Sequence, residues 1–188
     1  MSMSTGTWTT IRTKRAVRDY DPRPVPEEII HRVLDAGRLA GSARNLQPWR
    51  FILVRQKETR QALSKCGRFA SHLAGAAFVV VICTAADRRR WAAFDAGRAA
   101  QNMMLAGWDQ GVGSCATGLH NEARTRQLLG IPEDYDIQVA IAFGYPAPSG
   151  EGPVRRFIRA RVLGLQVRKP LHEIVYHERW GQREGRAH

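Results

Sequence analysis

A short polar segment between two apolar stretches carries side chains suited to binding a heterocyclic ligand. Residues 40–49 read Ala-Gly-Ser-Ala-Arg-Asn-Leu-Gln-Pro-Trp. Asn45 and Gln47 each offer amide donors and a carbonyl acceptor to a ring edge, and Gly and Ser let the main chain approach a flat ligand closely. Pro48 fixes its own φ and favours an extended conformation at Gln47. The same composition also suits a plain helix-to-strand loop with Trp49 packed in the core.

A cluster of cations precedes this segment. Lys14, Arg15 and Arg18 stand within five residues, at the end of a helix expected over residues 7–14. Several ammonium and guanidinium donors that converge on one dianion form a phosphate site. The alternative is a solvated patch that satisfies the terminal carbonyls of the helix.

A glycine-containing segment follows a long helix. Residues 111–119 read Gly-Val-Gly-Ser-Cys-Ala-Thr-Gly-Leu. Glycine permits close approach of the main chain to a ligand. The spacing is not GxGxxG, so it does not support a dinucleotide-binding Rossmann site. Cys115 has no paired base in the sequence and is not assigned as a nucleophile.

Together these segments resemble the FMN-dependent nitroreductase family. Residues 41–49 resemble its PSxxNxQPW signature, with Gly41 where the family usually has Pro. Residues 14–20 resemble its RRSxRxF element, with Ala16 in place of Ser, which removes one hydroxyl donor and leaves the main-chain N–H.

Two later segments extend the resemblance. Residues 111–119 resemble the family's GLGSCWIGG loop, and the departures are Ala116 for Trp, Thr117 for Ile and Leu119 for the second Gly. Residues 168–175 resemble the closing RKPLeEiv, whose Arg is the last phosphate ligand, here Arg168. Two residues earlier some members carry Lys, and here Gln166 stands there.

The resemblance implies a fold and an assembly. The fold would be α+β, with a central, mostly antiparallel sheet flanked by helices, in a single domain over residues 1–188. The chain would form an intertwined homodimer, with the long helix of residues 88–111 in the core and the subunit interface. Two FMN sites would lie at that interface. One subunit would supply Lys14, Arg15, Arg18, Gly118 and Arg168, and the other Ser42, Ala43, Asn45 and Gln47.

The implied cofactor-binding residues are Lys14, Arg15, Ala16, Arg18, Gly41, Ser42, Ala43, Asn45, Gln47, Ala116, Thr117, Gly118, Leu119 and Arg168. In the family, a main-chain N–H at the position of Gly118 points at flavin N5, and the cation at Arg18 reaches the N1–C2=O edge. No catalytic side chain is implied, because the flavin carries the hydride chemistry. NADH or NADPH would reduce the flavin and leave, and a nitroarene or quinone would then take its place.

Two alternatives remain at this point. The same fold could carry other flavin chemistry, as a dehydrogenase, a dehalogenase or a flavin-cleaving enzyme. The net charge of +12 instead suggests a basic nucleic-acid-binding domain. However, the 29 basic residues include only four Lys and are spread along the chain. We therefore read most of the charge as compositional bias on solvated helix faces and expect no nucleic-acid partner.

Hydrophobic periodicity predicts the elements that position these segments. Asn121 and Gly130 are expected to cap a helix between them. The predicted helices cover residues 7–14, 26–40, 57–66, 88–111 and 121–129, and the predicted strands cover residues 51–55, 78–84 and 137–144.

The rest of the sequence bears on the environment of the protein. Cys66, Cys83 and Cys115 are odd in number and far apart, which favours free thiols and a reducing compartment, the cytoplasm. Cys83 is expected to be an inert core thiol and His31 a surface or half-buried residue. No secretory signal, membrane-spanning run or HExxH-type metal motif is visible.

Overall fold

The structure is a computed structural model that describes residues 6–148 and 168–182. The chain divides into two compact units, Met1–Pro148 and Ser149–His188. In the second unit, the described residues form the short helix α7, Leu171–Ile174, followed by a turn in which the rings of Tyr176 and Trp180 lie 4.6 Å apart. The single-domain assignment of the whole chain stays a prediction.

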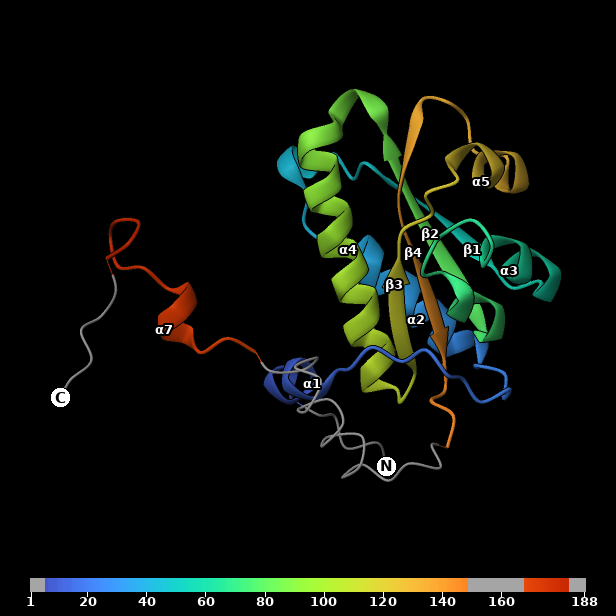
Figure 1. The fold of residues 1–188 in the computed structure, drawn as a ribbon, viewed down its shortest axis with the longest axis horizontal. Coiled ribbons are helices and arrows are strands. Elements are labelled where there is room, and N and C mark those ends of the chain that lie inside the picture. The colour runs from blue at the N-terminus through green and yellow to red at the C-terminus, as the bar shows by residue number, and fades with distance from the viewer. Residues whose placement is uncertain (1–5, 149–167, 183–188) are drawn as a thin grey trace. The chain divides into compact units, whose positions relative to one another are not determined.

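The first unit alternates helices and strands (Figure 1). Its α-helices are α1 (Thr7–Thr13), α2 (Glu27–Arg38), α3 (Lys57–Leu63), α4 (Arg89–Asp109) and α5 (Glu122–Leu129). Three 3₁₀ turns are η1 (Ala43–Asn45), η2 (Ser71–Gly75) and η3 (Ala86–Arg88). The strands are β1 (Trp49–Val54), β2 (Phe78–Ala85), β3 (Gly113–Thr117) and β4 (Tyr135–Gly144). Every predicted element is present, with ends shifted by a few residues.

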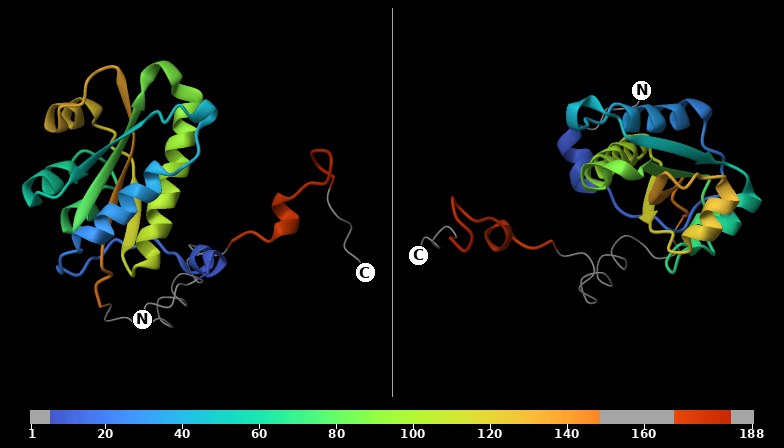
Figure 2. Two further views of the ribbon diagram at one scale, coloured as in Figure 1. Left: turned by 180° about the vertical axis from the view of Figure 1, so that it is seen from behind. Right: turned by 90° about the horizontal axis from the view of Figure 1, so that it is seen from above.

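The strands form one sheet in the order β1-β2-β4-β3, and every adjacent pair of strands is antiparallel. Helices lie on both faces, α2 and α4 on one and α3 and α5 on the other, as Figure 2 shows. This arrangement confirms the predicted α+β class with an antiparallel sheet.

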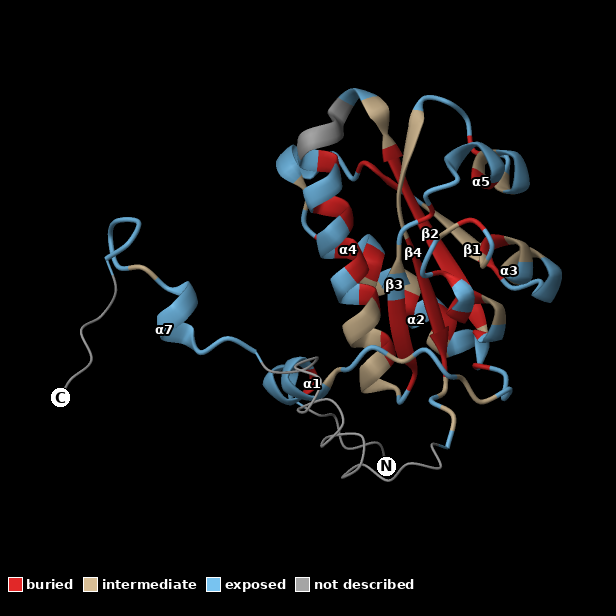
Figure 3. Cartoon of the chain, viewed as in Figure 1, coloured by how far each residue is buried: buried red, intermediate tan, exposed pale blue. Residues whose placement is uncertain are grey.

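The central strand β2 is buried on both faces because its side chains alternate between two cores (Figure 3). Phe78, Val80 and Ile82 pack into the cluster that also contains residues of α2 and α4. Val79 and Val81 pack into the second cluster, with residues from the α3 side. Two buried faces require an apolar residue at every position, which explains the continuous β-branched run.

Helices α2 and α4 meet closely at Gly37. A Cβ on this residue would lie 2.1 Å from Cε of Met103, which is fully buried. The missing side chain therefore sets the spacing between the two helices, and with it the place where α2 delivers the segment that begins at Gly41.

The predicted caps of α5 are confirmed. The Asn121 side chain accepts a hydrogen bond from the Arg124 N–H at 3.1 Å, and Gly130 ends the helix at a φ of 65°. Cys83 lies in the core, where burial raises the pKa of its thiol to about 11, as an inert thiol requires. His31 is exposed and lies 3.3 Å from Glu27.

The glycine-containing segment differs from the expectation of a loop. Residues Gly113–Thr117 form the edge strand β3, paired with β4 from Gly113 opposite Gly144 to Thr117 opposite Ala140. Small side chains allow this strand to be covered on its outer edge by another segment, as described below. No helix in the described ranges is long and apolar enough to cross a membrane.

Candidate functional site

The predicted cation cluster lies against the free edge of β3. Ala16 forms an isolated parallel bridge with Ser114, and the Val17 N–H donates to the Ser114 carbonyl at 3.0 Å. A Cβ on Gly113 would lie 2.5 Å from a methyl carbon of Val17, so only glycine allows this contact. Main-chain pairing therefore brings residues 14–18 to the glycine-containing segment.

The charges of this segment act on the neighbouring strand. Burial raises the pKa of the Cys115 thiol, and the positive charges of Arg18 and Lys14 oppose that rise. Burial likewise raises the pKa of Tyr20, again opposed by Arg18. Arg15 is exposed and donates to the carbonyls of Arg12 and Lys14. Of the three cations, Lys14 and Arg18 thus act electrostatically on buried groups beside β3.

The end of β3 exposes main chain. Ala116 and Gly118 are exposed, Thr117 is half-buried, and Leu119 is buried in the second core cluster. Gly118 follows the last residue of β3 paired with β4. The side chain of Leu119 packs in the core, so only the main chain of this residue is available to contact a ligand.

A second glycine determines the position of Gly118. A Cβ on Gly67 would lie 2.3 Å from the Gly118 carbonyl oxygen, a main-chain atom that cannot rotate away. Nearby, the buried His72 places Nε2 3.3 Å from the Cys115 carbonyl. Burial lowers the pKa of His72, which favours the neutral ring at this position.

The segment Gly41–Gln47 adopts a strained conformation. Arg44, Asn45 and Gln47 have φ values of 51°, 55° and 45°, in the left-handed region that non-glycine residues rarely occupy. The Ser42 hydroxyl accepts from the Gln47 N–H at 2.9 Å, and Gln47 Nε2 lies 3.2 Å from Asn45 Oδ1. Such strain at exposed polar residues is typical of binding loops.

The expectation of an extended Gln47 is therefore wrong. The hydrogen bond from its N–H to Ser42 and the contact of its side chain with Asn45 outweigh the local preference imposed by Pro48. Trp49 does pack in the core, with 6% of its surface exposed, and stacks on Phe51.

This segment is attached to the N-terminal half of α4. The Ala43 N–H donates to Oδ2 of the buried Asp95 at 3.1 Å, and Asp95 also lies 3.7 Å from Arg98. A Cβ on Gly41 would lie 2.3 Å from Arg98 Nη2, so the arginine occupies the space that a larger residue would need.

The two predicted groups contact different parts of α4. Lys14 Nζ lies 3.6 Å from Sδ of Met104, nine residues beyond Asp95. At 1.5 Å per residue, the two contact points are about 13 Å apart along the helix. Within one chain, residues 14–18 thus lie beside β3, whereas residues 41–47 contact a different part of α4 and do not join them.

Arg168 is exposed and is the first described residue of the second unit. Its predicted role as a phosphate ligand stays a prediction. Gln166 lies outside the described residues.

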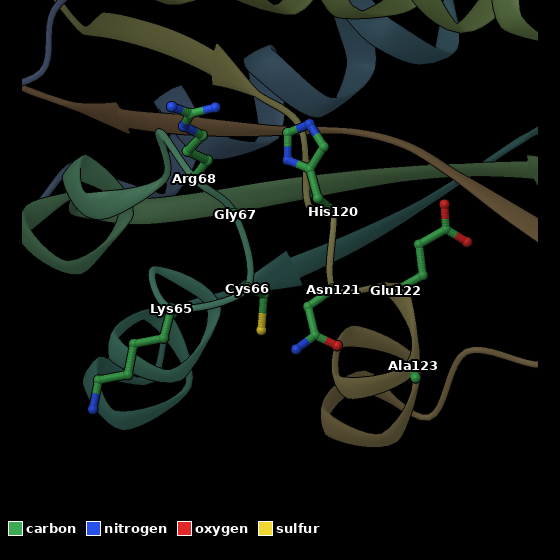
Figure 4. Close-up of a pocket in the computed structure, with 8 residues that line it drawn as sticks. All are labelled: Lys65, Cys66, Gly67, Arg68, His120, Asn121, Glu122 and Ala123. Carbon is green, nitrogen blue, oxygen red and sulfur yellow. The ribbon is translucent and has the colours of Figure 1, made fainter.

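Gly67, which lies against Gly118, also lines a surface cavity (Figure 4). The cavity has a volume of about 770 Å³, and its described lining comes from the segment after α3 and from the start of α5: Lys65, Cys66, Gly67, Arg68, His120, Asn121, Glu122 and Ala123. The side chains of Arg68 and His120 rise on the same side of the cavity, whereas Lys65 points away (Figure 4). The sequence motifs did not single out Arg68 or His120. His120 directly follows the glycine-containing segment of residues 111–119, and this adjacency is the only sequence signal for it.

Comparison with known proteins decides the family. A profile of the Nitroreductase family matches residues 11–67 and 65–145. The chain belongs to the nitroreductase family. This confirms the resemblance drawn from the motifs at residues 14–20, 41–49 and 111–119, all of which lie in the matched ranges or overlap them.

Individual nitroreductase-like proteins agree with the profile. An Archaeoglobus fulgidus protein provisionally named NADH dehydrogenase/NAD(P)H nitroreductase is 35% identical over 144 residues, which cover 72% of this chain and 83% of that protein. An NADPH-flavin oxidoreductase of Vibrio harveyi is 26% identical over 190 residues, covering 91% of this chain and 73% of that protein.

A solved structure shows the same fold. The Desulfovibrio desulfuricans protein, provisionally identified as a nitroreductase and crystallised in complex with FMN, superposes with a TM-score of 0.75 at 25% identity. The match covers 94% of this chain and 98% of that protein.

Proposed function

We propose that this nitroreductase-family protein is an FMN-dependent oxidoreductase that accepts hydride from NADH or NADPH and delivers it to an electron-poor small molecule such as a nitroaromatic or a quinone. The observation that supports this most directly is the main-chain pairing of residues 14–18 with β3. It combines a phosphate-type cation cluster with exposed main chain at Gly118 in a chain of this family.

The donor set fits FMN. Among the described residues, Arg15 and Arg18 have no carboxylate partner, so their charges remain available for a phosphate or an anionic ring edge. The exposed carboxamides of Asn45 and Gln47 suit the polar edge of a heterocycle. FMN supplies the hydride chemistry when bound.

The residues of the chain then bind and orient. In this proposal Lys14, Arg15 and Arg168 hold the phosphate, and the main-chain N–H of Gly118 faces the reacting edge of the ring. Arg18 places a fixed positive charge where the reduced ring gathers negative charge, which favours reduction. A general base on the protein is not required, because hydride transfer moves the hydrogen together with its electrons.

A homodimer would complete the site. Residues 41–47 stand about 13 Å along α4 from the contact of Lys14, so we infer that they serve the site of a partner subunit. The N-terminal half of α4 offers an apolar face for that contact, since Trp91 and Phe94 are 61% and 59% exposed. Such a face in water is typical of an interface.

Light scattering at sub-micromolar concentration tests the assembly. The expected mass is about twice the 21.1 kDa of one chain. A flavin-loaded, active monomer would overturn the two-subunit site while leaving the oxidoreductase assignment intact.

The activity is tested by spectrum and turnover. Purified protein with added FMN should be yellow, oxidise NADH or NADPH, and reduce a nitroaromatic or a quinone in alternating half-reactions. A colourless protein that ignores FMN but binds DNA in a salt-dependent manner would favour the nucleic-acid alternative. The three buried free cysteines support the proposed cytoplasmic location, because they suit a reducing compartment.

A further inference from the structure

A second cavity, separate from the predicted flavin residues, lies where α2 and α3 begin. Its volume is about 610 Å³, within the range of small-molecule sites. Three chain segments line it: residues 21–30 around the start of α2, residues 55–60 around the start of α3, and residues 74–78 leading into β2. None of the residues predicted to bind FMN is among the described lining residues.

The lining carries an excess of positive charge. Four cations, Arg23, Arg55, Lys57 and Arg60, face two carboxylates, Asp21 and Glu27. Both carboxylates are already engaged. Asp21 accepts from the N–H and Nε of Arg23 at 2.8 and 3.2 Å, and Glu27 pairs with Arg55 and His31.

Two of the four cations have no ion-pair partner. Within the described part of the chain, neither Lys57 nor Arg60 forms an ion pair, so the lining side chains carry a formal charge of +2, which the nearby Glu58 offsets in part at Arg60. Two positive charges in one concave site attract a dianion.

Arg60 holds its guanidinium in place but leaves one nitrogen unused. Its Nη1 donates to the Arg55 carbonyl, whereas its Nε is buried and has no hydrogen-bond partner in the described structure. Burial lowers the pKa of Arg60, and the charge of Glu58 opposes that fall. The bond to Arg55 thus fixes the guanidinium beside the cavity, where its positive charge acts on a ligand although the buried Nε does not reach one.

The remaining wall of the cavity is apolar. Val25, Ile30, Ala76 and Phe78 all line it and are 1–8% exposed, so they form a fixed surface continuous with the two cores. Arg23 lies 4.4 Å from the centre of the Tyr145 ring, which fixes its position at the rim. The part of this wall open to a ligand comes mainly from Val25 and Ile30, which are 8% and 6% exposed.

We propose that this cavity is a second ligand site, which binds a small organic phosphate monoester of about nucleotide size. The phosphate pairs with Arg60 and Lys57, and the organic part covers the wall of Val25, Ile30 and Phe78. The site is distinct from the one proposed for FMN, so a phosphate monoester binds here while one FMN stays bound at its own site.

Isothermal titration calorimetry tests the proposal on the full-length protein that carries bound FMN, after free FMN, itself a phosphate monoester, has been removed by gel filtration. Adenosine monophosphate serves as the phosphate monoester, with inorganic phosphate and adenosine as its two parts. We expect saturable binding of the monophosphate, weaker binding of inorganic phosphate and the weakest binding of adenosine. Inorganic phosphate that binds as tightly as the monophosphate would overturn the role of the apolar wall. Absence of binding by all three would overturn the site.

Two variants locate the binding. Arg60→Met and Lys57→Met should each weaken the monophosphate about tenfold or more, because each removes one charge-assisted bond. Arg32→Met is the matched control, since Arg32 is exposed on α2 and is not among the described lining residues. Lys57 is exposed, so Lys57→Met should fold normally. This variant therefore tests the location of the site even if Arg60→Met fails to fold. Unchanged affinity in Lys57→Met would place the binding elsewhere and overturn the assignment.

Discussion

Two parts of the predicted flavin site are built in different ways. Residues 14–18 are held by main-chain pairing with β3, where Gly113 allows close contact with Val17, and Gly67 allows close contact with Gly118 just after the strand. Residues 41–47 are held by side chains: Asp95 accepts from the Ala43 N–H, and Ser42 accepts from the Gln47 N–H. The first part is an extension of the sheet, whereas the second is a strained loop fixed to a helix.

The difference indicates which substitutions each part tolerates. A site built from main chain is insensitive to most side-chain changes but fails where a Cβ cannot fit. A strained loop depends on the few bonds that hold it, so the loss of one acceptor releases the strain.

The largest effect is expected where Gly67 meets the main chain of Gly118. Gly67→Ala places a Cβ 2.3 Å from the Gly118 carbonyl oxygen and should lower the free energy of unfolding by about 3 kcal/mol, as overpacking does. Bound FMN should be lost with it, since Gly118 must move. Urea unfolding and flavin absorbance measure both. Gly75→Ala is the control, because nothing lies within 4 Å of its added Cβ. Equal effects of the two substitutions would show that the Gly67 contact relaxes freely.

Arg168→Ala tests the contributor from the second unit. A charge-assisted bond is worth about 1.5–3 kcal/mol, so FMN affinity should fall by roughly one to two powers of ten. Riboflavin, which lacks the phosphate, should bind the variant and the parent about equally. Fluorescence quenching titrations give both affinities. If riboflavin weakened as much as FMN, Arg168 would have a structural role and no part in phosphate binding.

Asp95→Ala tests the loop. Removal of the buried acceptor leaves the Ala43 N–H unpaired and should cost about 1–3 kcal/mol of stability, with weaker FMN binding. Asp35→Ala is a matched control, since Asp35 pairs with Arg38 at the same i,i+3 spacing but is exposed. Melting curves and FMN titrations of the two variants should differ clearly. Equal losses would mean that Asp95 acts only through Arg98.

Arg18→Met tests the electrostatic role of the first part. Two unit charges 4 Å apart interact by about 4 kcal/mol at an effective dielectric of 20, and solvent and charge delocalisation reduce this to about 1–2 kcal/mol. For a two-electron couple, the bound-flavin potential should fall by roughly 20–45 mV. Arg18→Lys should retain much of the parent potential. A dye-coupled redox titration that gives the parent potential in flavin-saturated Arg18→Met would refute the proximity of Arg18 to the ring.

The smallest effect concerns His72, which packs beneath β3. Burial lowers its pKa in the folded protein, so below about pH 6.5 the unfolded chain takes up a proton that the folded protein resists. The free energy of unfolding should therefore fall as the pH drops through this range, and less steeply in His72→Gln. Urea unfolding at several pH values measures the two slopes. Parallel slopes would exclude His72 as the cause.

The sequence by itself determined the family, the sheet class and the order of the helices and strands except for β3. The β-branched run of residues 78–84 and the caps at Asn121 and Gly130 are local signals, and local chain preferences express them directly. The motif residues were likewise readable, because each match depends on residue type and spacing alone.

Only the tertiary structure decided how those motifs meet. The partner of residues 14–18 is a strand about a hundred positions later, and no local preference encodes that pairing. Gln47 illustrates the same limit: the sequence predicted an extended residue before Pro48, but hydrogen bonds to Ser42 and Asn45 hold it at a φ of 45°. The basic cavity around Arg60 also draws on three distant segments. The pairing with β3 and the cavity depend on long-range contacts, whereas at Gln47 several hydrogen bonds within one segment together outweigh the small free-energy differences between backbone conformations.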